Sequence, residues 1–257
     1  MTSQPPLAAG NTRVKETRKL SRRSVRTERR LFLADGPKAV EGALSVPGCV
    51  VEVFATPQGA ERYTDLLDGV PTTLVDERAM AGLSDSVTPA GVVALCHFLP
   101  EPGGLAGARL VALCADVRDP GNAGTVIRCA DAAGADAVVL AGDSVDAYNP
   151  KTVRASVGSL FHLPVHVKRD PAAAVAAAQA AGLTVLAADM DGESLFDTDL
   201  SGPTAWLFGN EAWGLPAELR ALADRVVSIP IYGRAESLNL STAAAVCLYA
   251  SARAQRA

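Results

Sequence analysis

The sequence predicts an α/β fold in two domains, and three observations lead to this prediction. Apolar runs of strand length alternate with helix-length segments along most of the chain, and many of these runs are continuous. Continuous apolar strands are typical of a parallel sheet with helices on both faces. A stretch rich in Pro and Gly, residues 100–108, interrupts the alternation. We therefore expect a small α/β domain at 31–99, a linker at 100–108 and a larger parallel-sheet domain at 109–257.

Residues 1–99 are expected to form a basic N-terminal segment followed by this small domain. Residues 1–10 are expected to be a disordered tail, and the segment up to residue 30 predicts a helix that runs into a strand. Pro37 suits the first position of a helix over 37–44. The other expected elements are strands at 49–56, 71–76 and 91–99 and helices at 59–69 and 77–86.

The larger domain continues the alternation of strands and helices. Strands are expected at 109–117, 136–142, 164–168, 183–189, 204–211 and 225–231. Helices are expected at 122–134, 150–163, 171–182, 216–224 and 239–256. Ligands of open parallel sheets bind beyond the carboxyl ends of the strands, so we expect a site in the loops that follow them.

Composition argues against several classes of protein. Five widely spaced cysteines in apolar surroundings indicate buried free thiols in a reducing compartment. No Cys or His cluster has metal-ligand spacing, so no metal is expected. No signal-peptide core or spanning segment is visible, which predicts a cytoplasmic protein without membrane contact.

Charge is unevenly distributed along the chain. The net charge is −4, yet the first 30 residues contain nine Lys or Arg against two Glu. A basic segment on an acidic body is what a phosphate-binding region needs. A solvated basic helix is the alternative that charge alone leaves open.

Three loops of the larger domain carry an unusual number of Gly, Asn and acidic residues. In the first, "DPGNAGTVIRCADAAG" (119–134), Gly121 permits a tight turn and Asn122 is expected to cap the helix. Arg128 follows within that helix and needs an acidic or phosphate partner. An ion pair with Asp116 or Asp131 would be purely structural, and spacing does not decide between the two readings.

The second loop is "FGNEAWGLP" (208–216), where Glu211 emerges at the end of an apolar strand. It is either a ligand-binding carboxylate or a capping residue. The third is "GRAESLNLSTAAAV" (233–246), with Ser237, Asn239 and Ser241 at alternate positions. In an extended segment these three side chains would face one side, and capping of the last helix explains only one of them.

Common nucleotide-binding and hydrolase motifs are missing. There is no G-x-G-x-x-G fingerprint after a strand, no P-loop and no G-x-S-x-G elbow. A nucleotide-dependent oxidoreductase on a doubly wound sheet is therefore disfavoured.

Taken together, these loops and "KTVRASVGSLFHLPV" (151–165) resemble the SpoU/TrmH-type RNA ribose 2′-O-methyltransferases of the SPOUT superfamily. The resemblance covers residues 109–252. Residues 31–98, beginning "LFLADGPKAVEGAL", resemble the ribosomal-protein-like α/β module that binds substrate in many members. The resemblance implies a parallel-sheet SPOUT domain with a C-terminal trefoil knot, a homodimer whose contact surface includes the closing helix, and S-adenosylmethionine as cofactor.

The resemblance also implies roles for particular residues. The catalytic positions are Asn122, Arg128, Glu211, Ser237 and Asn239. The cofactor-binding positions are Leu207, Phe208, Gly209, Asn210, Gly214, Ile229, Ser237, Leu238 and Asn239. The residues expected to bind RNA are Arg22, Arg23, Arg26, Arg29, Arg30, Arg128 and Arg154. No general base is assigned, because an arginine keeps its proton at all accessible pH values.

The sequence thus predicts a metal-free RNA 2′-O-methyltransferase that acts on ribosomal RNA. Transfer RNA is the alternative substrate, and a non-catalytic RNA-binding or assembly protein of the same fold is the alternative function. The basic segment 1–30 is expected to reach RNA flanking the target nucleotide.

Overall fold

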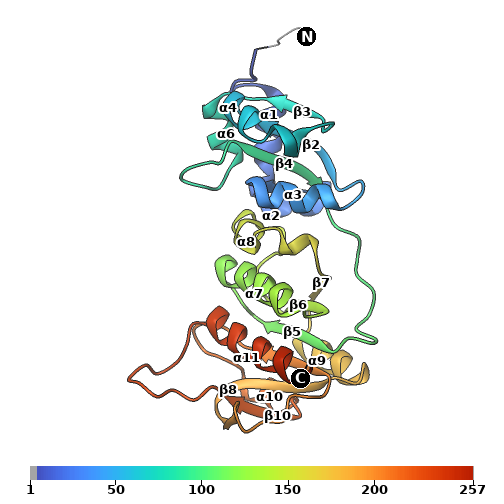
Figure 1. Cartoon of the computed structure of the whole chain (residues 1–257), viewed down its shortest axis with the longest axis vertical. Coiled ribbons are helices and arrows are strands. Elements are labelled where there is room, and N and C mark those ends of the chain that lie inside the picture. The colour runs from blue at the N-terminus through green and yellow to red at the C-terminus, as the bar shows by residue number, and fades with distance from the viewer. Residues whose placement is uncertain (1–4, 257) are drawn as a thin grey trace. The chain divides into compact units, whose positions relative to one another are not determined.

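Two β-sheets, each with its own hydrophobic core, organise the chain in this computed structural model, which describes residues 5–256 (Figure 1). Unit 1 comprises residues 1–100 and 148–161, and unit 2 comprises residues 101–147 and 162–257.

Unit 1 is built on a mixed sheet with the strand order β1-β4-β2-β3. β4 pairs antiparallel with β1 and β2, whereas β2 and β3 are parallel. The strands are β1 (Leu31–Asp35), β2 (Val50–Ala55), β3 (Thr72–Leu74) and β4 (Val92–His97). The helices are α1 (Thr12–Arg18), α2 (Arg23–Arg29), α3 (Pro37–Ser45), α4 (Pro57–Arg62), α5 (Thr64–Leu67), α6 (Glu77–Leu83) and α8 (Pro150–Ser156), with 3-10 turns η1 (Lys19–Ser21) and η2 (Ser159–Phe161).

The basic helices α1 and α2 belong to the core of unit 1, which differs from the predicted separate extension over 1–30. Val14 and Leu20 are buried in the hydrophobic cluster that α6 and the sheet complete. The N–H of Leu7 donates to the carbonyl of Leu74 at 2.8 Å, and Leu7 bridges Val75. Residues 5–10 are therefore not a disordered tail, and residues 1–4 lie outside the described residues. The apolar face of these helices, not their charge, decides where they pack.

Helix α8 and turn η2 also pack in unit 1, although the predicted boundaries placed them in the domain at 109–257. α8 contacts β1, and the ring of Phe161 lies 6.0 Å from that of Phe32, centroid to centroid. Tyr148 stacks on Phe98 at 4.0 Å, and its hydroxyl accepts a hydrogen bond from the N–H of Leu99. This aromatic cluster holds residues 148–161 against the sheet of unit 1.

Unit 2 contains a six-stranded sheet in the order β10-β8-β9-β5-β6-β7, and every pair in it is parallel. The strands are β5 (Leu110–Ala115), β6 (Ala137–Ala141), β7 (Val165–Lys168), β8 (Thr184–Ser194), β9 (Thr204–Phe208) and β10 (Arg225–Ser228). The helices are α7 (Pro120–Ala133), α9 (Pro171–Ala180), α10 (Ala217–Arg220) and α11 (Leu240–Ala254). The prediction of an α/β fold with a parallel sheet in the larger domain is confirmed.

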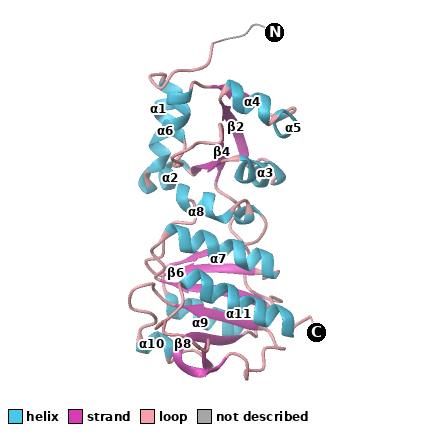
Figure 2. Cartoon of the chain, turned by 60° about the vertical axis from the view of Figure 1, so that its left-hand side comes forward, coloured by secondary structure: helices cyan, strands magenta, loops and turns pink. Residues whose placement is uncertain are grey.

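Helices cover both faces of the unit 2 sheet. Val111 and Leu113 of β5 point into a core that Val175 of α9 completes. α7 and α11 lie side by side over the other face (Figure 2). There the buried indole of Trp206 in β9 donates to the hydroxyl of Ser251 in α11 at 2.9 Å. Alternate residues of one strand thus serve two cores, as continuous apolar strands require.

The cysteines are free thiols, as predicted, and all but the partly exposed Cys129 are buried. Burial raises the pKa of Cys114 and of Cys247 to about 12. Within residues 5–256, no helix has the length and apolar character that crossing a membrane requires.

Candidate active site

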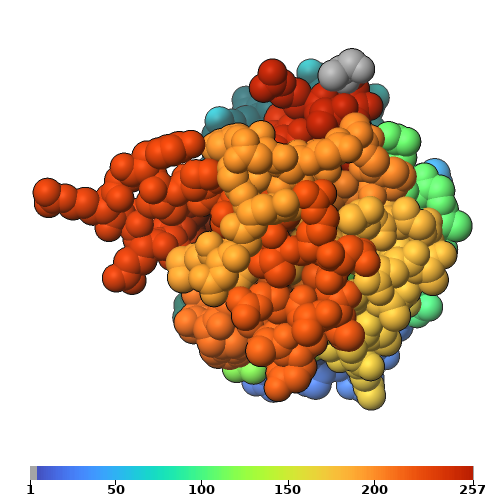
Figure 3. All heavy atoms as spheres, turned by 90° about the horizontal axis from the view of Figure 1, so that it is seen from below, coloured from blue at the N-terminus to red at the C-terminus, as the bar shows by residue number. Residues whose placement is uncertain are grey.

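The loops after β5, β9 and β10 come together at one edge of the unit 2 sheet. β5 and β9 are paired up to Cys114 and Phe208, so the loops that follow them start side by side. The third loop, residues 229–239, connects β10 to α11. It projects from the body of unit 2, where Figure 3 shows it in red-orange. Carboxyl ends of parallel strands are where such sheets bind ligands.

Asp119, and not Asn122, caps helix α7. The Asp119 carboxylate accepts a hydrogen bond from the N–H of Asn122 at 2.8 Å, and Pro120 occupies the first turn. The predicted capping role of Asn122 is therefore wrong, because the helix begins two residues earlier at an Asp-Pro pair that suits its start. The side-chain amide of Asn122 makes contacts to other loops instead.

A continuous chain of hydrogen bonds joins the three loops. The amide nitrogen of Asn239 donates to Asn122 Oδ1 at 3.1 Å, and the amide nitrogen of Asn122 donates to Glu211 Oε1 at 3.2 Å. Asn239 Oδ1 accepts from the N–H and the hydroxyl of Ser241 and so caps α11. Residues that are 117 and 89 positions apart in the sequence thus share one network.

Glu211 anchors this network to the β5–α7 loop. Its carboxylate accepts hydrogen bonds from the backbone N–H groups of Arg118 at 3.2 Å and Asp119 at 3.0 Å. Burial alone would raise the pKa of Glu211, but hydrogen bonds from its own N–H, from Arg118 and from Asn122 outweigh burial and hold the pKa below its ordinary value. Glu211 is therefore ionised at neutral pH and is more than a helix cap.

Arg128 is exposed on α7, six residues after Asn122. Asp131, one of its two suggested partners, instead pairs with His162 at 2.7 Å, and Asp116 accepts from the N–H of Asp143. No ion pair or hydrogen bond of the Arg128 side chain is found in the described part of the chain. Neither Asp116 nor Asp131 therefore forms, in this part of the chain, the structural ion pair with Arg128 that spacing left open.

Beside the network lies a pocket of about 450 Å³. Seven of the residues predicted to bind the cofactor line it: Phe208, Gly209, Asn210, Gly214, Ile229, Ser237 and Leu238. The other two residues predicted to bind the cofactor do not line the pocket: Leu207 is fully buried, and the side chain of Asn239 is bonded to Asn122 and Ser241. Ser237, Leu238 and Leu240 all face the pocket, which corrects the expectation that serines and leucines point to opposite sides.

A tight turn shapes the mouth of this pocket. Asn210 and Gly214 exchange two backbone hydrogen bonds, at 3.0 and 2.9 Å. The Asn210 side chain donates to the carbonyl of Asp116 at 2.6 Å and accepts from the N–H of Ala212 at 2.8 Å. A Cβ added to Gly209 would come within 2.3 Å of the Gly214 carbonyl carbon, so only glycine fits there. The turn holds residues 211–213 in a fixed position.

Several pocket residues were not predicted. Ala188, Asp189 and Met190 line the pocket from β8, whose position beside β9 in the parallel sheet was a usable signal. Trp213, Ile231 and Glu236 lie in the loops themselves. Their contribution depends on how these loops fold, which no local sequence pattern indicated.

The arginines expected to bind RNA differ in their surroundings. Arg22 and Arg23 are exposed at the start of α2, whereas Arg26 is buried and donates to the carbonyls of Leu20 and Ser21. That geometry takes Arg26 out of the set of side chains available to RNA.

Three other arginines of this set make contacts inside unit 1. Arg29 pairs with Glu16 at 2.8 Å, and the Arg30 guanidinium lies 4.7 Å from the centroid of the Phe98 ring. Arg154 lies 3.2 Å from a carboxylate oxygen of Asp85. RNA binding by these three stays a prediction.

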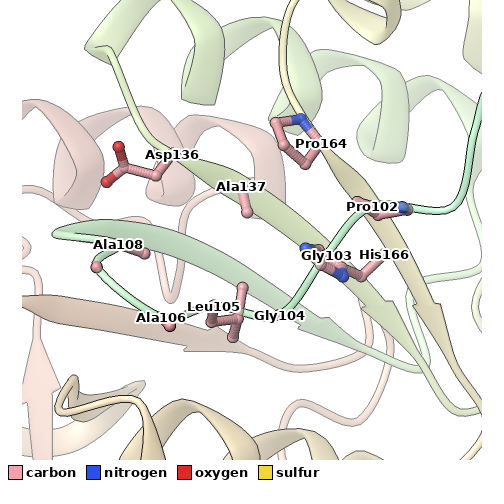
Figure 4. Close-up of a pocket in the computed structure, with 11 residues that line it drawn as sticks. Pro102, Gly103, Gly104, Leu105, Ala106, Ala108, Asp136, Ala137, Pro164 and His166 are labelled. Atoms are coloured by element: carbon pink, nitrogen blue, oxygen red, sulfur yellow. The ribbon is translucent and has the colours of Figure 1, made fainter.

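A second, smaller pocket of about 210 Å³ lies under the linker, at the amino ends of β5, β6 and β7 (Figure 4). Leu105 packs against the core there, and burial lowers the pKa of His166. This edge is opposite to the three loops, so we assign the pocket to the packing of the linker. Among residues 5–256 no group of His, Cys, Asp or Glu is suited to hold a metal ion.

Comparison with known proteins gives the same picture of both parts of the chain. Residues 109–249 match the family model of the SpoU rRNA methylases, and residues 11–94 match that of the MRM3-like substrate binding domain. The chain is 40% identical to the 23S rRNA (guanosine(2553)-2′-O)-methyltransferase RlmP of Bacillus subtilis (strain 168), over 94% of this chain and 96% of that protein.

Solved structures resemble the whole chain as well. The crystal structure of an RNA 2′-O ribose methyltransferase has a TM-score of 0.87 at 31% identity and covers 98% of this chain and 99% of that one. The SpoU methyltransferase AviRb from Streptomyces viridochromogenes, in complex with AdoMet, has a TM-score of 0.83 at 31% identity and covers 95% and 98%. The three loops, their shared network and the matches over both units lead to one conclusion: the chain belongs to the SpoU rRNA methylase family.

Proposed function

We propose that this protein transfers a methyl group from S-adenosylmethionine to a ribose 2′-hydroxyl of large-subunit ribosomal RNA. One observation carries the proposal: Asn122, Glu211 and Asn239, from three distant loops, form one hydrogen-bonded network beside a pocket at the carboxyl edge of the sheet. The 23S rRNA methyltransferase names of relatives such as RlmP support the choice of substrate.

The residues of the pocket fit S-adenosylmethionine. Its volume of about 450 Å³ lies within the usual range for small-molecule sites. Glu211 and Glu236 of the lining attract a ligand that carries a sulfonium and an ammonium group, whereas the third carboxylate, Asp189, is paired with Arg220 at 3.3 Å. When bound, S-adenosylmethionine supplies an electrophilic methyl group on sulfur. The complex of AviRb with AdoMet supports this assignment.

The network serves to hold the loops in register. The Glu211 carboxylate accepts two hydrogen bonds from backbone N–H groups of the β5–α7 loop and one from the Asn122 side chain in the first turn of α7, which leaves it little capacity to take a further proton. Asn239 ties the start of α11 to Asn122. We infer that these three are positioning residues, because displacement of reacting groups by about 1 Å costs on the order of 100-fold in rate.

Arg128 is the residue that we expect to touch RNA at the reacting centre. Its guanidinium is exposed, and its planar set of N–H donors suits a phosphate and polarises a hydroxyl but is not a general base. Ser237 lines the pocket and is proposed to hydrogen-bond the cofactor or the target hydroxyl. The general base stays unassigned.

We propose that unit 1 contributes RNA affinity through exposed cations, with Arg22 and Arg23 at the start of α2 as the main candidates. The match of residues 11–94 to a substrate binding domain supports this role. We also propose a cytoplasmic location, which the similarity to the rRNA methyltransferase RlmP of the bacterium Bacillus subtilis supports.

A trefoil knot and a homodimer complete the proposal. The return of α11, after the long loop 229–239, to pack on β5, β9 and α7 supports a knot in this segment. A tightened knot would shorten the fully extended chain in single-molecule pulling.

The half-exposed Tyr249 on α11 supports a contact surface for a second copy, and light scattering after size exclusion tests the dimer.

The central test is incubation of the protein with labelled S-adenosylmethionine and separate pools of unmodified ribosomal and transfer RNA, followed by mapping of ribose-methylated positions. We expect label at the 2′-oxygen of one or few large-subunit nucleotides. If only transfer RNA were labelled, transfer RNA and not ribosomal RNA would be the substrate. Calorimetry that detects no S-adenosylmethionine binding would favour a non-catalytic RNA-binding protein.

A further inference from the structure

We propose that Trp213 and Arg118 form a stacking platform for a nucleobase of the RNA at the methylation site. This inference rests on the proposed function and adds a substrate-positioning pair to it. Trp213 is 56% exposed, whereas Trp206, the other tryptophan of the chain, is 0% exposed. Such exposure of a large aromatic side chain beside a network of polar residues points to a ligand rather than to the core.

The tip of the β9 turn presents Trp213 in a fixed position. The paired backbone hydrogen bonds between Asn210 and Gly214 close the turn, and the Asn210 side chain ties it to Asp116. Glu211, two residues before Trp213, is bound to the β5–α7 loop. A rigid aromatic platform loses little conformational entropy when it binds, which favours stacking.

Arg118 completes the platform. Its guanidinium carbon lies 5.1 Å from the centroid of the Trp213 ring, and its Nη2 is 3.6 Å from a carboxylate oxygen of Asp143. A guanidinium over an indole is a cation–π contact. Since the cation covers one side and the indole is still half exposed, part of the ring is left for another flat group. Aromatic rings and arginine planes are the groups on which proteins stack unpaired RNA bases.

Charge distinguishes RNA from the cofactor as the partner of this ring. Trp213 lines the pocket together with the carboxylates of Glu211 and Glu236, which suit the cationic S-adenosylmethionine, whereas Asp189 is paired with Arg220. Trp213 also contacts the cation Arg118, which does not line the pocket and which attracts polyanionic RNA and repels a positively charged cofactor. Trp213 therefore stands at the border between the cofactor pocket and the path of the RNA.

Intrinsic fluorescence tests the platform, because Trp206 is buried and Trp213 is the exposed emitter. The probe is large-subunit ribosomal RNA transcribed without modifications. We expect RNA to quench the wild-type emission and to leave the emission of W213F unchanged. We also expect W213A to raise the RNA Kd and KM about tenfold and W213F to raise them no more than about twofold, since stacking needs only an aromatic face. The Kd for S-adenosylmethionine is expected to stay within about twofold in both variants.

A matched control is F196A, which removes an exposed aromatic side chain of unit 2 that does not line the pocket. Its RNA affinity is expected to equal that of the wild type. Three results would overturn the platform. The first is quenching by S-adenosylmethionine without RNA, together with a loss of cofactor affinity in W213A, and the second is RNA affinity that is unchanged in W213A. The third is Trp213 emission that changes with protein concentration but not with RNA, because a second copy of the chain would then cover the ring.

Failure of the platform and failure of the proposed function give different results. If the wild type methylates RNA and W213A does so with an unaltered KM, the platform is wrong and the methyltransferase stands. If RNA quenches Trp213 but no cofactor binds and no methyl group is transferred, the platform stands and the proposed function is wrong.

Discussion

Arginines on α2 of unit 1 and on α7 of unit 2 have the same charge and opposite surroundings. Arg26 is buried and donates to two carbonyls, and Arg29 pairs with Glu16. Arg128 is exposed, and no partner of it is found in the described part of the chain. The basic segment therefore uses part of its charge to hold unit 1 together, whereas α7 presents a guanidinium to solvent. Charge density by itself does not identify the arginine that meets the substrate.

The largest effect is expected at Arg128. Arg128→Ala should lower kcat for RNA methylation about 100- to 1000-fold, because it removes a preorganised cation from the reacting centre. The cofactor Kd by calorimetry should not change. Arg128→Lys keeps the charge but loses the two-pronged donor geometry, so we expect partial activity. If Arg128→Ala turned over at the wild-type rate, Arg128 would have no role at the reacting centre, and α7 would not differ from α2 in this respect.

The network at Asn239 should give the next effect. Asn239→Ala removes the bridge to Asn122 and the cap of α11, and it should cost about 1 kcal/mol of unfolding free energy. Asn239→Ser keeps a capping hydroxyl but is too short for the bridge. We expect both variants to lose activity about 30-fold, by displacement of the loops. Denaturant unfolding separates the two contributions, and a fully active Asn239→Ser variant would show that only the cap matters.

The buried arginine should affect stability rather than RNA binding. Arg26→Met leaves the carbonyls of Leu20 and Ser21 without these donors, and it should lower the free energy of unfolding by about 2 kcal/mol. Arg23→Met, an exposed change on the same helix, should alter it by less than about 0.5 kcal/mol. Urea titration followed by far-UV circular dichroism measures both values, and equal unfolding of the two variants would contradict this difference.

RNA affinity should show the reverse order for these two arginines. Arg23→Met should weaken RNA binding in a salt-dependent way and lower the slope of log K against log salt concentration by about 1. Arg26→Met, measured below its unfolding transition, should keep the wild-type slope. Filter binding over a salt series gives both values, and equal slopes in the two variants would remove the distinction between buried and exposed cations.

These contrasts also mark how far the sequence could lead. The alternation of strands and helices along the chain and the continuous apolar runs predicted the parallel sheet, because a strand that is buried on both faces is apolar at every position. The positions of the three loops after apolar strands predicted that they lie at one edge of the sheet, and the resemblance to the SpoU/TrmH-type enzymes implied that Asn122, Glu211 and Asn239 belong to the site. The capping of α7 by Asp119 was open to prediction from the Asp-Pro pair and was assigned one turn too late.

Other features depended on packing between distant residues. The aromatic cluster that takes residues 148–161 into unit 1 joins Tyr148 and Phe161 to Phe32 and Phe98, and no local pattern links these positions. The burial of Arg26 likewise follows from how α2 meets η1. Trp213 sits in a short loop without periodicity, so its exposure and its contact with Arg118 were visible only in three dimensions.

The smallest expected effect compares one carboxylate from each unit. Burial raises the pKa of Asp35 in unit 1 despite its hydrogen bonds from Ser84 and from the N–H of Asp85, whereas hydrogen bonds hold the pKa of Glu211 in unit 2 below its ordinary value against a burial effect that would raise it. Glu211 therefore stabilises the fold above about pH 4.5, and this contribution is lost as pH falls through its lowered pKa. For Asp35 the sign is opposite: protonation favours the folded state, and this contribution is lost as pH rises through its raised pKa.

The wild-type stability relative to Glu211→Gln should therefore increase with pH across the acidic range, and relative to Asp35→Asn it should decrease. Urea unfolding at a series of pH values between about 3.5 and 6 measures both slopes. Slopes of the same sign would mean that the two carboxylates do not differ as their surroundings imply. Opposite slopes would show that hydrogen bonds determine the pKa of Glu211 in the loop network of unit 2, where the ionised form is needed. They would also show that burial determines the pKa of Asp35 beside Ser84 and Asp85 in unit 1.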